Sequence, residues 1–454
     1  IGRGRKEKHK RRYDNLCSRI ERHAAMNLFI GARRVTEEEQ RALIDKMRKK
    51  LQEIALQEGD ILVCKAKTQY GIIAQWMCCQ ELGLIPFFVA PDYPVENSRF
   101  MEYADVSYLL KLDEQETIRI EKLSRKTGPH LNVKPGSVIH MTSATSGNPK
   151  FILRTKEQLD LEVSRYCKRL QLTEKDVIMS IAPFYHAYAF LCPMLGSIYT
   201  NATLVQPDVL LPRNVIEICR EQKVTCLYGV PFFIEQMADT DKKYQLSEAL
   251  RYVISSGEKL TAKTAHKFYD RFGIGLNQQY GCTEMGTVTF AEALEPDESQ
   301  GRPIEGVEFK IEEIEGKSYI SVNTNGTMGF YIQEEVRPIA EGFYLSNDLG
   351  HFDAEGHLYI DGRGDDVIIR AGEKINLREI STILEKMDGV QGVKLEVGKD
   401  SLKEITCYYN AEREIDKNEF IEYCKQHFSA FQIPNYYHRT QKPVGQTANW
   451  KHKK

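Results

Sequence analysis

The most informative stretch of the sequence is Met141-Thr142-Ser143-Ala144-Thr145-Ser146-Gly147-Asn148-Pro149-Lys150. It follows a short apolar run, Val138-Ile139-His140, which predicts a β-strand. Small side chains let backbone N–H groups approach an anion closely, hydroxyl groups add donors, and a lysine supplies a full positive charge. The stretch therefore predicts a loop that binds phosphate. A Ser/Thr-rich surface turn has the same composition, so this interpretation requires companion motifs nearer the C-terminus.

The predicted loop is not the P-loop of kinase-like NTPases, which requires G-x-x-x-x-G-K-[ST], because it has one glycine and no Gly-Lys pair. It resembles instead the phosphate loop of the adenylate-forming superfamily. This superfamily comprises acyl- and aryl-CoA ligases, luciferases and peptide-synthetase adenylation domains. The usual form of its loop is T-S-G-[TS]-[TS]-G-x-P-K, and Ala144 replaces one glycine of that form.

Further motifs resemble those of the same superfamily and occur in its order. Tyr280-Gly281-Cys282-Thr283-Glu284 resembles Y-G-x-T-E, and Ser346-Asn347-Asp348 stands where Thr-Gly-Asp is usual. Gly362-Arg363-Gly364-Asp365-Asp366-Val367-Ile368 matches G-R-x-D-D-x-I. Ala371-Gly372-Glu373-Lys374-Ile375 resembles G-G-E-x-I, and Thr447-Ala448-Asn449-Trp450-Lys451 resembles T-x-N-G-K with a tryptophan in place of glycine. The resemblance thus spans nearly the whole chain.

The resemblance implies that the chain binds ATP and Mg²⁺, and it assigns roles to individual residues. The residues implied for the ATP phosphates are Thr142, Ser143, Thr145, Ser146, Gly147 and Lys150. Those implied for adenine and ribose are Ser256, Gly257, Glu258, Tyr280, Gly281, Thr283, Asp348 and Arg363. Glu284 is the implied magnesium ligand, and a carboxylate suits that hard cation.

The resemblance also implies a catalytic lysine and a moving domain. Lys451 would bridge the carboxylate of the acid and the α-phosphate, although a lysine this close to the chain end could also be a solvated side chain. Asp365 stands at the hinge position of the family. Ala371, Gly372 and Glu373 would shape a channel for the thiol of coenzyme A or of the phosphopantetheine of an acyl carrier protein.

The acid-binding segment follows the Pro183-Phe184 pair. Amino-acid-activating relatives place an aspartate there, whereas this chain has Tyr185-His186, so an α-amino acid is disfavoured as substrate. His186 is expected near the acyl carboxylate as a second catalytic residue, with a buried structural histidine as the alternative. Ala187-Tyr188-Ala189 adds bulk, which favours an aryl or short acyl acid. The predicted acid pocket comprises Tyr185, His186, Gly229, Val230 and Ser255.

Composition limits the classes of protein that remain. A length of 454 residues allows two or three domains, and a formal net charge of −2 gives no sign of a nucleic-acid partner. No apolar run reaches the roughly 20 residues of a membrane helix. The 11 cysteines lack the spacing of a zinc site, which favours free thiols and a cytoplasmic location. The basic residues 2–12 receive no assigned role, and the oligomeric state is left open.

The order of predicted elements indicates an α/β protein. Short apolar strands alternate with helices from residue 61 to residue 281, which is typical of βαβ units in mainly parallel sheets. We expect a large adenylation domain, residues 1–362, with two βα-layered sheets and a small β-barrel after residue 301 that includes residues 329–333. Residues 363–454 are expected to form a small, mobile α+β lid domain. Residues 13–57 are expected to be helical, with Thr36 and Glu39 as a capping box.

Three functions remain open from the sequence. The favoured one is an ATP-dependent carboxylic acid ligase that forms an acyl-adenylate and then a thioester. The second is an adenylating enzyme that loads only a carrier protein or an amine. The third is a protein that binds nucleotide or acyl-adenylate without turnover, to which Ala144, Asn347 and Trp450 point because each departs from the family pattern.

Overall fold

A computed structural model of the chain describes residues 26–54, 56–123, 128, 130–131, 133–142, 149–293, 298–333, 336–370, 373–398, 404–428, 432–441 and 444. The chain divides into two compact units. The first comprises Ile1–Phe309, Val322–Tyr344 and Phe352–Tyr359, and the second comprises Lys310–Ser321, Leu345–His351 and Ile360–Lys454. The domain boundary predicted between residues 362 and 363 stays a prediction.

The first unit contains a nine-stranded sheet in the order β15-β14-β13-β12-β11-β9-β10-β1-β2. Its central strands, from β13 to β1, run parallel, and antiparallel strands close both edges. The strands are β1 (Leu28–Ile30), β2 (Arg33–Val35), β9 (Val177–Ser180), β10 (Thr203–Gln206), β11 (Cys226–Gly229), β12 (Tyr252–Ser255), β13 (Asn277–Cys282), β14 (Gly286–Ala291) and β15 (Arg302–Pro303).

An eight-stranded sheet of the same unit has the order β19-β18-β8-β7-β4-β3-β5-β6. Parallel pairing joins β7, β4, β3 and β5, and the remaining pairs are antiparallel. The strands are β3 (Ile61–Ala66), β4 (Ile85–Phe88), β5 (Tyr108–Leu112), β6 (Ile118–Lys122), β7 (Val138–Met141), β8 (Phe151–Arg154), β18 (Phe330–Ile332) and β19 (Val336–Pro338).

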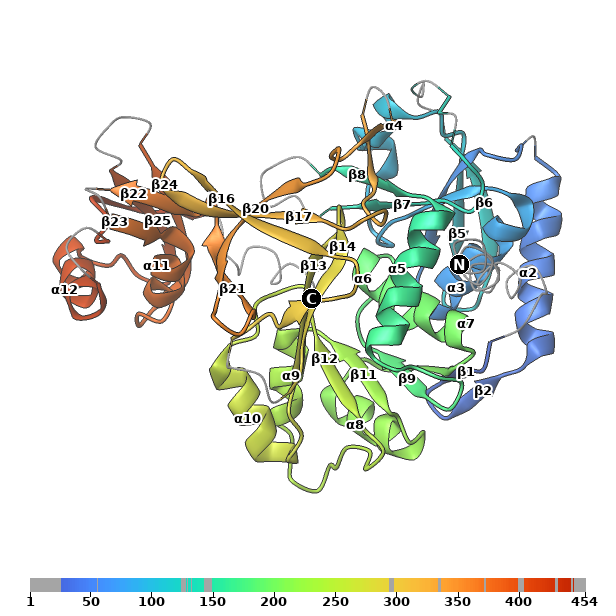
Figure 1. The fold of residues 1–454 in the computed structure, drawn as a ribbon, viewed down its shortest axis with the longest axis horizontal. Helices are drawn as coiled ribbons and strands as arrows, with labels where there is room; N and C mark the ends of the chain where they lie inside the picture. Colours follow the sequence, from blue (N-terminus) through green and yellow to red (C-terminus); the bar gives the residue numbers. More distant parts are fainter. Residues whose placement is uncertain are drawn as a thin grey trace, which may run out of the picture. The chain divides into compact units, whose positions relative to one another are not determined.

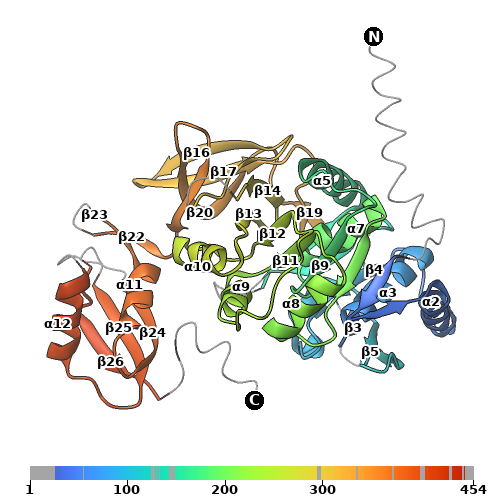
Figure 2. The same cartoon turned by 90° about the horizontal axis from the view of Figure 1, so that it is seen from below.

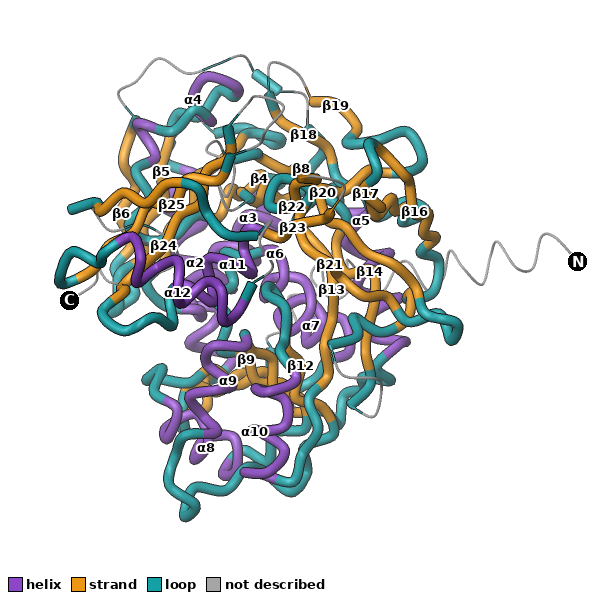
Figure 3. The backbone as a smooth tube through the Cα atoms, turned by 90° about the vertical axis from the view of Figure 1, so that its left-hand side faces the viewer, coloured by secondary structure: helices purple, strands orange, loops and turns teal. Residues whose placement is uncertain are grey.

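Helices cover both sheets of the first unit. α5 and α7 lie between the sheets (Figure 1), while α8, α9 and α10 gather beside β9 and β12 (Figure 3). Their bounds are α2 (Glu37–Gln52), α3 (Gln69–Leu82), α4 (Phe100–Tyr103), α5 (Lys156–Arg169), α6 (Ala187–Ala189), α7 (Gly196–Thr200), α8 (Pro212–Glu221), α9 (Pro231–Ala238) and α10 (Ala262–Phe272), with a π-helical turn, Phe190–Leu195, and a short 3₁₀ turn, Val95–Asn97.

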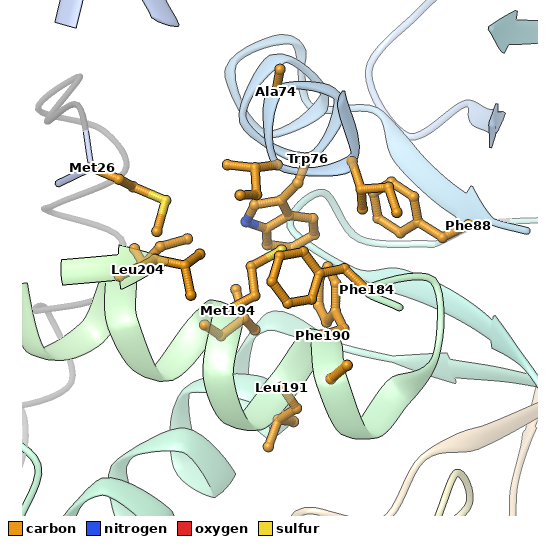
Figure 4. Close-up of a cluster of buried hydrophobic side chains, with 14 of the residues drawn as sticks. Met26, Ala74, Trp76, Phe88, Phe184, Phe190, Leu191, Met194 and Leu204 are labelled. Atoms are coloured by element: carbon orange, nitrogen blue, oxygen red, sulfur yellow. The ribbon is translucent and has the colours of Figure 1, made fainter. Parts of the chain in front are cut away.

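The core between the two sheets is mainly aromatic and aliphatic. Trp76 of α3 packs edge-on against Phe190 of the π-helical turn, with ring centroids 5.0 Å apart. Figure 4 shows Trp76 directed toward Phe184, Phe190 and Met194, all of them buried. Burial of such side chains stabilises the fold by about 1.5–3 kcal/mol each. The core therefore anchors the segment that follows β9, which carries Tyr185 and His186 of the predicted acid pocket.

The second unit holds most of a four-stranded sheet, β16-β17-β20-β21, and a small α+β body. In that body, α11 and α12 lie beside β24, β25 and β26 (Figure 2), and the Tyr423 hydroxyl of α12 donates to the Ile383 carbonyl of α11. The elements are β16 (Glu308–Ile314), β17 (Lys317–Asn323), β20 (Tyr344–Phe352), β21 (Leu358–Arg363), β22 (Val367–Arg370), β23 (Glu373–Asn376), α11 (Leu377–Leu384), β24 (Val390–Val397), β25 (Ile405–Ala411), α12 (Lys417–His427) and β26 (Tyr436–Arg439).

The predicted α/β class, with two stacked sheets in the large unit and a smaller α+β body, is confirmed. The predicted small β-barrel is wrong in detail. Its described strands form a four-stranded sheet with β16 and β21 at the edges, because β18 pairs with β8 and β19 pairs with β18, so both join the eight-stranded sheet. Four strands are fewer than even a small barrel uses to close.

The helix expected over residues 13–57 is confirmed only for Glu37–Gln52. Its capping box is present: the Thr36 hydroxyl accepts from the Glu39 N–H, and the Thr36 N–H donates to the Glu39 carboxylate. Leu28–Ile30 and Arg33–Val35 are strands, and residues 13–25 lie outside the described residues. Within the part of the chain that the structure describes, no helix is long and apolar enough to cross a membrane.

Candidate active site

The β7–β8 hairpin holds the two ends of the predicted phosphate loop. The Thr142 N–H donates to the Lys150 carbonyl (2.9 Å), and the Lys150 N–H donates to the Thr142 hydroxyl (3.0 Å). These two bonds continue the antiparallel register, in which Met141 pairs with Phe151. Residues 143–148 lie outside the described residues, so the phosphate-binding roles of Ser143, Thr145, Ser146 and Gly147 stay predictions.

Lys150 places its ammonium group beside a carboxylate and a phenol. Its Nζ lies 3.7 Å from Glu284 Oε1 and 3.5 Å from the Tyr331 hydroxyl, and 5.3 Å from the centroid of the Tyr331 ring. The Lys150 side chain is 47% exposed, whereas the Glu284 side chain is 10% exposed. The fold thus brings together the predicted phosphate lysine and the predicted metal ligand, from two different sheets.

Tyr331 carries no signal in the sequence that predicts a place in the site. It lies on β18 opposite Ile152 of β8, and this pairing brings it next to Lys150. Burial, followed by the charge of Glu284, raises the pKa of the Tyr331 phenol, and burial also raises the pKa of the neighbouring Tyr344. Both phenols therefore stay protonated at neutral pH. The strand pairing thus brings Tyr331 beside the predicted phosphate lysine.

Glu284 sits in the turn that joins β13 to β14. The turn follows a register shift between Tyr280 and Gly281, and the Glu284 carbonyl accepts from the Gly329 N–H at 3.0 Å. A Cβ atom at Gly281 would overlap the Gly286 carbonyl oxygen. The two backbones thus approach so closely that only glycine fits at position 281. Thr283, a further predicted nucleotide residue, lies in the same turn.

The residues predicted to line the adenine slot gather at the carboxyl ends of β12 and β13. The Ser256 hydroxyl donates to the Gln279 carbonyl (3.3 Å), next to Tyr280. Gly257 has φ +87°, a left-handed conformation that favours glycine. The Gln278 amide donates to the Glu258 carbonyl at 3.1 Å. Ligands of open α/β sheets bind at this edge, where the parallel strands end.

The predicted acid-pocket residues also lie at strand ends of the nine-stranded sheet. Tyr185 and His186 follow β9, while Gly229 of β11 pairs with Ser255 of β12. The Tyr188 hydroxyl donates to the carbonyls of Gly229 (3.4 Å) and Ile254 (3.3 Å), so Tyr188 fills the space beside these strands. Val230 follows Gly229 and is the N-cap residue of α9.

His186 and Ser255 offer polar groups in that region. The His186 side chain is exposed and its ring lies 4.6 Å from the Tyr185 ring; desolvation by the surrounding protein lowers its pKa. The imidazole is therefore neutral at pH 7. Ser255 is fully buried, and its hydroxyl has no hydrogen-bond partner among the described residues.

Asp348 and Arg363 form a second group of predicted residues, within the smaller unit. The Arg363 guanidinium lies 3.7 Å from the Asp348 carboxylate. The Asp348 N–H donates to the Ser346 hydroxyl (3.2 Å), and that hydroxyl donates to the Ile320 carbonyl (2.8 Å), which fixes β20 at this point. Asp348 is half-buried and Arg363 remains partly exposed.

Asp365, the predicted hinge residue, accepts a hydrogen bond from the Asn347 amide at 2.7 Å. Asn347 stands where glycine is usual in the family pattern, and its own carbonyl accepts from the Gly364 N–H at 2.7 Å. Glu373 begins β23, where it pairs with Arg370. Ala371, Gly372 and Lys451 lie outside the described residues, so the thiol channel and the catalytic lysine stay predictions.

Comparison with known proteins agrees with this geometry. Residues 18–330 match the protein family described as AMP-binding enzyme. A medium-chain fatty-acid–CoA ligase of Escherichia coli is 31% identical over 264 residues, which cover 55% of this chain and 46% of the ligase. A 3,4-dihydroxybenzoate–[aryl-carrier protein] ligase of Bacillus anthracis is 23% identical, over 66% of this chain and 68% of that protein. The chain thus spans about half to two thirds of the length of these relatives.

Solved structures show the same fold. O-succinylbenzoate coenzyme A synthetase of Bacillus subtilis, in complex with AMP, superposes with a TM-score of 0.79 at 19% identity. The match covers 97% of this chain and 98% of the synthetase.

Proposed function

Because the chain belongs to the AMP-binding enzyme family, we propose that it is an ATP-dependent ligase that joins a carboxylic acid to a thiol through an acyl-adenylate. The observation that carries the proposal is the Lys150–Glu284 pair beside the hairpin that holds the predicted phosphate loop. A cation for phosphate and a carboxylate for a metal ion lie within 4 Å of each other there. Phosphoryl chemistry needs both kinds of group.

Lys150 would contact the β- and γ-phosphates of ATP, and Glu284 would hold Mg²⁺. A lone, nearly buried carboxylate fits this ion, because Mg²⁺ is commonly bound by one or two carboxylates together with substrate phosphates. Bound Mg²⁺ would neutralise negative charge on the leaving pyrophosphate. Binding of the phosphates would draw the Lys150 ammonium away from Glu284 and free that carboxylate for the metal.

Asp348 would accept hydrogen bonds from the ribose hydroxyls, and Arg363 would donate a further one. The Asp348 backbone is fixed through the Ser346 hydroxyl and the Ile320 carbonyl, and its carboxylate lies 3.7 Å from the Arg363 guanidinium. Ser256, Gly257, Glu258, Tyr280, Gly281 and Thr283 would line the adenine. Each role is inferred from the family motif, and the adenine roles also from the position of these residues at the ends of β12 and β13.

The proposed reaction has two steps. The carboxylate of the acid attacks the α-phosphorus of ATP, pyrophosphate leaves, and an acyl-adenylate forms. A thiol then attacks the acyl carbonyl, AMP leaves, and a thioester forms while the thiol proton passes to solvent or a base. Lys451 would hold the two reacting anions in line in the first step. Neutral His186 would lie beside the acyl carboxylate without adding a competing charge.

The acid is proposed to be an aryl or short acyl acid. Tyr188 bridges the Gly229 and Ile254 carbonyls, and a Cβ atom at Gly229 would meet the Ile181 side chain. Both observations support a pocket that is already crowded at the end of β11. The pocket residues Tyr185, Val230 and Ser255 supply an aromatic face, an aliphatic surface and one unsatisfied hydroxyl, which suit a planar acid with a polar substituent.

The favoured function and its first alternative differ in the thiol that accepts the acyl group. Coenzyme A is the favoured acceptor, whereas the similarity to an aryl-carrier-protein ligase supports the phosphopantetheine of an acyl carrier protein. Mass spectrometry of a reaction with ATP, one acid and coenzyme A tests the favoured version. Acyl-coenzyme A with stoichiometric AMP is the expected product. Adenylate formation without any coenzyme A thioester would instead favour the carrier-protein version.

The moving lid is tested separately. Asp365→Pro would restrict rotation at the proposed hinge and should slow thioester formation more than adenylate formation. Equal slowing of both steps would contradict a hinge at Asp365. None of the ten described cysteines forms a disulfide, which supports the cytoplasmic location that we propose.

A further inference from the structure

A buried ion pair joins β8, the strand that follows Lys150, to helix α5. Arg154 ends β8, the strand that begins beside Lys150, and its guanidinium donates to Glu162 of α5. The two side chains are only 3% and 2% exposed. Charged side chains are rarely buried to this extent, because water must be removed from both.

Glu162 also holds the turn that carries Glu284. Its second carboxylate oxygen accepts from the Thr287 backbone N–H at 2.8 Å. Gly286, at φ +76°, packs directly on this carboxylate, and a Cβ atom there would overlap it. One carboxylate therefore ties β8, which follows Lys150, to the first residues of β14, which follow Glu284.

The neighbouring His140 adds no charge to the Arg154–Glu162 pair. His140 lies on the same face of the β7–β8 hairpin, where it pairs with Ile152, two residues before Arg154. Burial, with a smaller contribution from the Arg154 charge, lowers the pKa of His140 to about 3. The imidazole is therefore uncharged at neutral pH, and Glu162 has Arg154 as its cationic partner.

Stability alone gives little reason for such a pair, because an apolar pair of similar volume is often as stable or more stable. What an apolar pair would lack is the acceptor for the Thr287 N–H and the directional link between β8 and β14. The ion pair thus fixes the position of the start of β14 relative to β8.

We propose that Arg154, Glu162 and the Thr287 N–H form a clamp that positions the Glu284 carboxylate relative to Lys150 for binding of Mg·ATP. None of the three touches the nucleotide in this proposal, so Arg154 and Glu162 are positioning residues. The inference rests on the proposed function, since it assigns Glu284 to the metal and Lys150 to phosphate.

Two variants test the clamp. Arg154→Met/Glu162→Leu replaces the pair with apolar side chains and removes the acceptor for Thr287. Glu162→Asp keeps the charge but shortens the side chain by one methylene, so it cannot reach both partners. We expect both variants to bind Mg·ATP at least tenfold more weakly, by isothermal titration calorimetry, while ATP affinity in EDTA changes less than threefold. A purely structural role would lower the two affinities alike.

Glu292→Gln is the matched control, because it breaks another ion pair between α5 and the end of β14, Arg169–Glu292 at 2.7 Å. We expect the Mg·ATP affinity of this variant to stay within twofold of the affinity of the unaltered protein. A folded clamp variant with unaltered Mg·ATP affinity would overturn the inference. If the unaltered protein itself failed to bind Mg·ATP, the proposed function would fail before any variant was compared.

Hydrogen–deuterium exchange tests the clamp without a variant. In the unaltered, nucleotide-free protein, the peptide that spans residues 283–287 should exchange as slowly as the adjoining parts of β13 and β14. Complete exchange of the Thr287 amide within seconds would contradict the clamp even if neither variant folded.

Discussion

Lys150 and Glu284 have opposite charges and lie 3.7 Å apart, yet only Lys150 is substantially exposed. Because solvent reaches Lys150 and screens its charge, the pair is expected to contribute little to stability. The sequence predicted both residues from separate motifs. It could not predict Tyr331, whose place beside Lys150 depends on the pairing of β18 with β8.

Lys150→Met tests the phosphate role. Loss of one charge-assisted contact that strengthens in the transition state should lower kcat/KM for ATP by about 100-fold, as expected for a single preorganised donor. Lys168→Met, which removes an exposed ammonium paired with Glu305 at the surface, is the control and should leave kcat/KM within twofold. Equal effects of the two substitutions would contradict a specific role for Lys150.

Asp348→Asn tests the ribose role. Hydrogen bonds to a charged group contribute about 1.5–3 kcal/mol, so the unaltered protein should prefer ATP over 2′-deoxy-ATP by at least tenfold. The variant should lose most of this preference, because its amide is a weaker acceptor. Asp361→Asn, in the same sheet and paired with His351, should keep the preference. A preference that survived Asp348→Asn would remove Asp348 from the ribose site.

The β13–β14 turn, which holds the predicted metal ligand Glu284, follows an irregularity in the register of the two strands. The register shift between Tyr280 and Gly281 precedes the turn, in which the Glu284 carbonyl accepts from the Gly329 N–H just before β18. Sequence predicted the strand and the turn here, because Gly281 is a local turn signal. The missed strands β1 and β2 lack such a signal, since β1 is fixed by pairing with β10, far away in the sequence.

Gly281→Ala tests the close approach in that turn. The new methyl group would overlap the Gly286 carbonyl, and overpacking of this kind costs about 1–3 kcal/mol. We expect a lower urea midpoint and weaker ATP binding. Gly196→Ala is the control, because its methyl group would meet Cys167 Sγ at an ordinary 3.7 Å. A Gly281 variant as stable as the Gly196 variant would show that the turn has more room than this geometry allows.

The β7–β8 hairpin carries a pH-sensitive group, His140. Its pKa is lowered to about 3 in the folded protein, below the ordinary 6.5, so the folded state prefers the neutral imidazole. The stabilising effect is full above pH 6.5 and is lost as the pH falls toward 3, by up to about 1.4 kcal/mol per pH unit. His140→Leu should therefore reduce the fall of the urea midpoint between pH 6.5 and 4. An unchanged pH profile would contradict a buried, neutral His140, and the exposed His130→Gln provides the reference.

For the molecule as a whole, the sequence predicts the fold class better than it predicts which strands pair. Local periodicity predicted the βαβ order, helices α11 and α12, and the change to short antiparallel strands after residue 301. It could not predict that β18 and β19 leave the predicted barrel for the eight-stranded sheet, because strand exchange between sheets depends on long-range pairing. The buried Arg154–Glu162 pair could likewise not be predicted from the sequence, since its partners meet only when α5 packs against β8 and β14.

The central claim is that the protein activates a carboxylic acid as an adenylate. Acid-dependent exchange of labelled pyrophosphate into ATP, over a panel of aryl, short-chain and medium-chain acids, measures that step without any thiol. We predict exchange with one or a few acids and a loss of at least 100-fold in Lys451→Ala. Absence of exchange with every acid, while calorimetry still detects Mg·ATP binding, would contradict the ligase and favour a protein that binds nucleotide without turnover.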